Sequence, residues 1–164
     1  MRPTFARDIF WAAGAVVAAF IAYSLLGTFG PAALAALNVF SLVVVFFAAN
    51  RGEIFGAALG SVAGLVQDSF SLGVFGVAGL TKTLLGFWTG YVARRVDIAP
   101  PARNAPFLLL ISSLELALWV LLNAVTRGDA PNLHGGLLAL QPVSTALLGS
   151  ALLYLQRRFE ARSL

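Results

Sequence analysis

The feature that most constrains the fold is an alternation of long apolar stretches with short connections that carry arginine. A membrane-spanning helix needs about 20 mainly apolar residues. Six stretches approach this length, at about 9–26, 32–49, 53–67, 72–93, 105–125 and 135–156. Because 59% of the residues are hydrophobic and only 11% are charged, the chain lacks the polar side chains that would cover a soluble domain. We therefore predict an all-α integral membrane protein, one multi-pass domain over residues 1–164 with six transmembrane helices.

The arginines predict the orientation of these helices, since Lys and Arg concentrate in short cytoplasmic loops. If the six stretches alternate in direction, nine arginines fall on one side of the membrane: Arg2, Arg7, Arg51, Arg94, Arg95, Arg103, Arg157, Arg158 and Arg162. Only Arg127 falls on the other side, so both termini are expected in the cytoplasm. The alternative is that 9–26 is a cleaved signal peptide, since Arg2 and Arg7 precede its apolar run, and this would leave five spanning helices.

The stretch 53–67 is the shortest of the six. It covers about 22 Å at 1.5 Å per residue, whereas a typical hydrocarbon core is about 30 Å thick. We expect it to cross where the bilayer thins or where neighbouring helices shield it. A re-entrant hairpin is the alternative, and it would upset the alternation of the arginines.

Composition also excludes several functions. The net charge of +4 comes from arginines spread over separate connections, which form no single basic face, so nucleic-acid binding is not expected. The chain has no cysteine and one histidine, His134, so a disulfide framework, a thiolate metal site and a multi-histidine metal site are excluded within one chain. No catalytic constellation stands out. We expect a protein that is not an enzyme and that holds no cofactor or metal.

Small residues recur at helical spacing in two neighbouring stretches. One set is Gly52, Gly56, Gly60 and Gly64, and the matching set is Ala78, Gly86 and Gly90. A spacing of four places such residues on one helix face and lets another backbone approach closely. We expect these two faces to pack on each other. The first stretch offers a third face, Gly14, Ala18 and Ala22, which carries no polar group and is expected to contact a partner.

Lys82 and Glu115 are the only charged residues deep within the expected helices, where each costs several kcal/mol unless it is paired or hydrated. In the predicted topology Lys82 lies about 15 Å, and Glu115 about 16 Å, from the outer ends of their helices. We therefore predict an ion pair between them. Asp68 competes for the lysine, so a network of all three is also open. Its possible roles are a structural lock, a ligand or proton pathway, or contact with a partner protein.

The segment 51–95 reads RGEIFGAALGSVAGLVQDSFSLGVFGVAGLTKTLLGFWTGYVARR. In its pattern it resembles the family of the rod-shape-determining protein MreD. That family has an Arg-Gly-like turn, a glycine-rich helix that ends in Asp, then Ser at plus three and Gly at plus four and plus eight. Asp68, Ser71 and Gly76 occupy three of these places. Leu72 replaces the plus-four glycine, and Gly73 follows it.

The resemblance implies a non-enzymatic component of the bacterial inner membrane that belongs to the cell-elongation machinery. Such proteins bind MreC, a single-span protein, and help to control lateral peptidoglycan synthesis. Their wider partners are the elongation transpeptidase and glycosyltransferase, MreB filaments and membrane lipid. The family in turn resembles the six-helix substrate-binding (S) components of energy-coupling-factor transporters, so that fold is the expected architecture. The resemblance carries no role for Lys82.

The resemblance of that family to transporter S components implies an alternative function, a substrate-binding membrane component of a vitamin-type transporter. A protein of this kind needs an outward pocket lined by polar and aromatic groups. The expected outer connections read GTFGP, QDSFSL and TRGDAPNLHGG, and they offer few aromatic side chains to hold a heterocycle. We therefore favour the scaffold.

Overall fold

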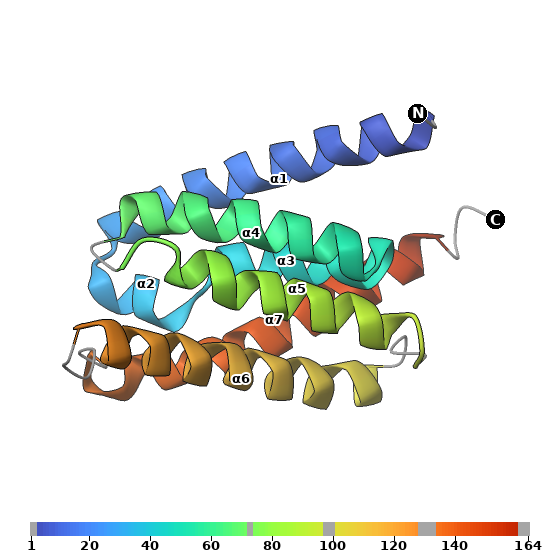
Figure 1. Cartoon of the computed structure of the whole chain (residues 1–164). Coiled ribbons are helices and arrows are strands. Elements are labelled where there is room, and N and C mark those ends of the chain that lie inside the picture. The colour runs from blue at the N-terminus through green and yellow to red at the C-terminus, as the bar shows by residue number, and fades with distance from the viewer. Residues whose placement is uncertain (1–2, 72–73, 97–100, 128–133, 161–164) are drawn as a thin grey trace.

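The computed structural model describes residues 3–71, 74–96, 101–127 and 134–160, and throughout these ranges the chain is helical wherever it has regular structure (Figure 1). The elements are α1 (Pro3–Thr28), α2 (Pro31–Ala36), α3 (Val39–Arg51), α4 (Glu53–Phe70), α5 (Val77–Ala93), α6 (Pro101–Arg127), the 3-10 helix η1 (His134–Ala139) and α7 (Leu140–Glu160). Arg2, Leu72, Gly73 and Arg162, which entered the sequence predictions, lie outside the described residues.

The helices run roughly along one direction and pass from one end of the bundle to the other (Figure 1). Within the described ranges, α2 with α3 forms one such pass and η1 with α7 forms another. Helix α3 lies at the centre, where it packs against α1, α4, α5 and α7. Its side chains Phe40, Val44 and Val45 are fully buried and form the middle of the apolar core.

Four stretches of the described chain are long and apolar enough to cross a membrane: 7–28, 32–51, 104–127 and 136–159. They identify the chain as a membrane protein with several candidate spans. Helices α4 and α5 are not among the four. Helix α5 has only 17 residues, and α4, with 18, carries polar residues near both of its ends. The prediction of an all-α multi-pass architecture therefore agrees with the structure, and length and hydropathy alone support four of the six predicted spans.

The prediction of one continuous helix over 32–49 is wrong, because the chain breaks between α2 and α3. Leu37 has an extended backbone, and Asn38 begins the next helix as its N-cap. The side-chain Oδ1 of Asn38 accepts a hydrogen bond from the backbone N–H of Ser41 at 3.2 Å. Asparagine is a favoured N-cap because it satisfies such an otherwise unpaired N–H. The apolar run is therefore divided into two helices, and Asn38 marks the start of the second.

The helices on either side of residues 71–76 also differ from prediction. Helix α4 continues through Phe70, so it covers about 27 Å and is one unbroken helix, not a hairpin. Helix α5 begins at Val77 and not at 72. The cause is Gly76, whose φ of 96° lies in the left-handed region that favours glycine. The polar stretch from Gln67 thus extends α4, and the connection to α5 is short.

Arginines gather at one end of the bundle. Arg51 ends α3, Arg94 and Arg95 follow α5, and the last turn of α7 holds Arg157 and Arg158. These helix ends lie together, at the end where α1 begins, whereas α6 reaches the opposite end with Arg127 (Figure 1). The described arginines therefore divide between the two ends of the bundle as the alternation predicts.

Candidate functional site

Helices α4 and α5 lie antiparallel and touch through bare backbone, as the spacing of small residues predicts. A Cβ added at Gly56 would overlap the backbone of Gly86, and one added at Gly60 would overlap the backbone of Lys82. The same holds between Gly64 and Ala78, and between Gly90 and Gly52. The contacting positions are therefore spaced four residues apart along both helices and are paired in antiparallel order. We call this contact the α4–α5 seam, and its members are Gly52, Gly56, Gly60, Gly64, Ala78, Lys82, Gly86 and Gly90.

Asp68 closes the end of the seam that lies away from Arg51 and Arg94. Its carboxylate accepts hydrogen bonds from three backbone N–H groups, those of Gly76 at 2.9 Å, Ala78 at 3.2 Å and Gly79 at 3.1 Å. These groups belong to the start of α5, where N–H groups lack helical partners and negative charge is favoured. Ser71 completes the turn, since its Oγ donates to the Asp68 carbonyl at 3.3 Å. Three residues of the sequence motif, Asp68, Ser71 and Gly76, therefore meet in one turn.

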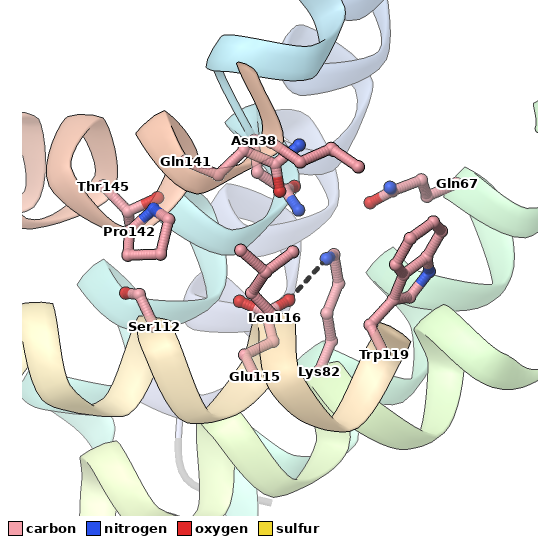
Figure 2. A pocket seen from close by; sticks show the side chains of 11 residues that line it. Asn38, Gln67, Lys82, Ser112, Glu115, Leu116, Trp119, Gln141, Pro142 and Thr145 are labelled. Carbon is pink, nitrogen blue, oxygen red and sulfur yellow. Dashed lines mark hydrogen bonds and ion pairs between the residues drawn. The ribbon is translucent and has the colours of Figure 1, made fainter. Parts of the chain in front are cut away.

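The predicted ion pair between helices α5 and α6 is present in the structure. Lys82 Nζ lies 2.7 Å from Glu115 Oε1, with 2% and 8% of the two side chains exposed (Figure 2). The three-residue network that would include Asp68 does not form, because Asp68 is engaged with the start of α5. Within the described ranges, Lys82 has Glu115 as its only ion-pair partner.

Ser41 of α3 takes the third place in this network. Its Oγ accepts from Lys82 Nζ at 3.0 Å and lies 2.8 and 2.9 Å from the two carboxylate oxygens of Glu115. Ser41 was not predicted from the sequence, because a serine in an apolar helix usually bonds back to its own backbone. The predicted topology places Ser41 about nine residues, ~14 Å, from the outer end of 32–49, close to the predicted depths of Lys82 and Glu115, and this depth marks it as a candidate partner of the pair.

The network joins the three helices α3, α5 and α6. A buried ion pair loses its hydration, and the attraction between the charges offsets this loss only where further hydrogen bonds are made. The hydroxyl of Ser41 supplies such bonds to both partners. Removing one partner of a pair of this kind typically costs about 3–5 kcal/mol. The ion pair and the Ser41 hydroxyl therefore tie the three helices together.

A polar cavity of about 50 Å³ adjoins the ion pair (Figure 2). Its walls come from the α2–α3 break, α4, α5, α6, η1 and α7. The polar side chains that line it, besides the ion pair, are Asn38, Gln67, Ser112, Gln141 and Thr145. Cavities of drug-sized ligands are about 300–1,000 Å³, so this one is far smaller. In the described part of the chain, no three His, Cys, Asp or Glu side chains are close enough to bind a metal ion.

The small-residue face of α1 remains uncovered in its first part. Gly14 and Ala18 are exposed, and a Cβ added at Gly14 meets no atom within 4 Å. Ala22 is half-buried. The face of α1 that packs on the bundle is a different one, which contains the buried residues Ala12, Val16 and Ala19. The face predicted for a partner is therefore available along Gly14 and Ala18.

A second set of polar contacts ties the arginine-rich end together. Arg51 pairs with Asp8 of α1 at 2.7 Å, and Arg94 pairs with Glu53 at 3.1 Å. Arg94 also donates to the carbonyl of Arg51 at 3.2 Å, at the end of α3. In the Arg94–Glu53 pair 59% and 23% of the side chains are exposed, so this pair contributes at most about 1 kcal/mol, whereas Asp8 is buried beside Arg51. These contacts orient helix ends and form no site.

Comparisons of the chain with family models, with curated proteins and with solved structures give no match.

Proposed function

We propose that this chain is a non-enzymatic membrane scaffold that regulates the bacterial cell-elongation machinery, as members of the MreD family do. The observation that carries the proposal is the turn between α4 and α5. Asp68, Ser71 and Gly76, the residues on which the sequence resemblance rests, are joined there by hydrogen bonds. They close a seam in which the helix backbones touch. A motif that fixes the geometry of a helix pair fits a structural role.

In this proposal the chain crosses the bacterial inner membrane six times, with both termini in the cytoplasm. The grouping of Arg51, Arg94, Arg95, Arg157 and Arg158 at one end of the bundle supports that orientation, because Lys and Arg favour the cytoplasmic side. Helices α4 and α5 are then the two crossings that rely on protein contacts, since neither is both long and apolar enough on its own. Their glycines face each other and are hidden from lipid.

The partner is an MreC-like single-span protein, and the face of α1 that contains Gly14 and Ala18 is its contact surface. Small residues allow a second helix to approach closely and gain van der Waals contact in lipid. This face is exposed, whereas the glycines of the α4–α5 seam are already covered. Through this partner the chain influences the elongation transpeptidase and glycosyltransferase in step with MreB.

Copurification with the single-span partner tests the proposal. We expect Gly14→Leu and Ala18→Leu to reduce the recovered partner about tenfold or more, equivalent to about 1.4 kcal/mol. Ala117→Leu, at an exposed alanine of α6, is the matched control and should leave recovery unchanged. Depletion of the protein should also produce rounded cells. Equal recovery with all three variants would remove α1 as the contact surface, and no recovery of any single-span partner by the unaltered protein would reject the scaffold role.

A vitamin-type transporter component is the second candidate, and the polar cavity is the observation that favours it. Its volume of about 50 Å³ is several-fold below that of a drug-sized site. Mass spectrometry of the purified protein distinguishes the two functions. A stoichiometric heterocyclic compound that coelutes with the protein would favour transport over the scaffold.

A further inference from the structure

Two buried polar atoms beside the Lys82–Glu115 pair have no hydrogen-bond partner among the described residues: Ser112 Oγ and Gln67 Oε1. Ser112 is only 3% exposed, and both residues line the polar cavity. A buried polar group without a partner costs about 1–3 kcal/mol. Such groups in native proteins are usually satisfied by water or by a ligand. The cavity is therefore built to hold something polar.

Lys82 adds a donor to this space. A lysine ammonium has three N–H donors, and those of Lys82 reach Ser41 and Glu115 within the described part of the chain. One N–H therefore remains. Figure 2 shows the amine of Lys82 and the amide of Gln67 directed toward the same space. The free groups therefore comprise at least two donors, the Lys82 N–H and the Ser112 O–H, and two acceptors, the Ser112 Oγ and the Gln67 Oε1.

The charges of the cavity exclude an ion as its ligand. Lys82 and Glu115 are the charged residues that line it, and they neutralise each other. An anion would have to compete with Glu115 for the lysine, and a cation would have to compete with Lys82 for the carboxylate. A neutral molecule leaves the pair intact. Because donors and acceptors are mixed, a hydroxyl group, which both donates and accepts, suits them better than a pure acceptor or a pure donor.

The size of the cavity sets the size of the ligand. One water needs about 10–15 Å³ of such volume, so about 50 Å³ holds roughly four waters. A molecule with about six non-hydrogen atoms replaces that many. Leu116, Trp119 and Pro142 supply apolar walls for its carbon atoms.

The unpartnered oxygens, the free N–H of Lys82, the balanced charge and the volume of the cavity all point to one kind of ligand. We propose that the polar cavity binds a small neutral polyhydroxyl group of the size of glycerol, which bonds to Ser112, Gln67 and Lys82. The group is either a free solute or the glycerol headgroup of a lipid, since both present the same hydroxyls. This inference does not depend on the scaffold function. It also differs from a vitamin site, because a heterocyclic cofactor is several times too large.

The absence of native cysteine permits a direct test by thiol accessibility. Ser112→Cys places a thiol in the cavity, and Ser113→Cys places one on the exposed apolar face of the same helix. The reagent is methyl methanethiosulfonate, which is close to glycerol in size and reacts with the thiolate that forms in water. In phosphatidylcholine nanodiscs we expect the Ser112→Cys variant to react about tenfold faster than the Ser113→Cys variant. Thr145→Cys places a thiol at a second cavity position and leaves the three proposed ligand contacts in place, so it is the variant for the protection experiment.

Protection by ligand is the decisive measurement. Glycerol should slow the reaction of the Thr145→Cys variant, which keeps Ser112, Gln67 and Lys82, saturably and with half-protection at about 1–100 mM as expected for so small a ligand, whereas sucrose should not. Protection in phosphatidylglycerol nanodiscs without added glycerol assigns the hydroxyls to a lipid, and protection only by added glycerol assigns them to a solute. The proposal is overturned if neither condition protects more than sucrose does, because the cavity then holds water alone. It is also overturned if the thiols of both cavity variants react as slowly as the thiol of the Ser113→Cys variant.

Discussion

The α4–α5 seam and helix α1 carry the same sequence pattern, small residues four apart, and use it in opposite ways. In the seam, a Cβ added at Gly56, Gly60 or Gly64 would meet the backbone of α5. In α1, a Cβ at Gly14 meets nothing within 4 Å, and the helix diverges from the bundle toward its first residues (Figure 1). The pattern therefore specifies a surface that a backbone can approach, and the rest of the fold decides whether one does.

The difference between the two regions has a physical source in the turn that joins α4 to α5. Asp68 binds three N–H groups at the start of α5, so the two helices of the seam are held in register at one end. Helix α1 has no such link to α4 among the described residues, and the ion pair of its Asp8 is made with Arg51, at the end of α3. Helices that lack both a register-fixing turn and a covered face remain free to pack against another chain.

A large side chain placed in the α4–α5 seam should have the largest effect on folding. Gly60→Leu puts its side chain into the backbone of Lys82, where nothing flexible can yield, so α4 and α5 must separate. Overpacking typically costs about 1–3 kcal/mol and more where backbone has to move. We expect loss of most folded protein, measured as the monodisperse fraction on size exclusion in detergent. Wild-type behaviour of Gly60→Leu would mean that the helices do not touch.

The next largest effect concerns the pair that ties α5 to α6. Lys82→Met leaves Glu115 buried without its counter-charge and should cost about 3–5 kcal/mol, seen as a lower thermal midpoint. Lys82→Met combined with Glu115→Leu should cost less than the sum of the single changes, with a coupling of about 1–3 kcal/mol. The charge swap Lys82→Glu with Glu115→Lys should likewise exceed either single variant in stability. Strict additivity would show that the two side chains do not interact.

A smaller effect is expected at the register-fixing turn. Asp68→Ala removes the acceptor of three N–H groups and should cost about 2 kcal/mol, at the upper end for the loss of a helix cap. Asp68→Asn keeps one carbonyl oxygen and should fall between alanine and the native residue. Hydrogen exchange of the backbone at residues 76–79 is the measurement, since those amides should exchange faster. If exchange rises equally across α6, the effect is global and the turn has no special role.

The smallest effect on stability is expected in α1. A Cβ at Gly14 meets no atom and Ala18 is exposed, so Gly14→Leu and Ala18→Leu should change the thermal midpoint of the isolated protein by the equivalent of less than about 0.5 kcal/mol. The same changes reduce partner recovery in the proposed function. A variant that folds normally and loses its partner would show that the small residues of α1 serve binding, whereas those of the seam serve folding. A large loss of stability would instead show that this face of α1 is covered within the chain.

Some parts of this architecture could be predicted because they depend on local spacing and on depth. The apolar stretches predict helices, the spacing of Gly56, Gly60 and Gly64 predicts a close contact, and the depths of Lys82 and Glu115 predict an ion pair. The break at Asn38 was not predicted, because hydropathy stays high through it and only the capping side chain marks it. The role of Asp68 was not predicted either, since charge and depth do not reveal backbone donors.

By itself, then, the sequence determined the helical class, the tight seam and the Lys82–Glu115 pair, because each follows from periodicity or from the cost of a charge in lipid. Only the tertiary structure decided which polar groups share a partner. It brought Ser41 of α3 to the ion pair, committed Asp68 to the start of α5, and left Ser112 and Gln67 with unsatisfied oxygens around one cavity in the described part of the chain. These outcomes depend on the rotation of each helix about its axis, which is set by packing against several neighbours at once.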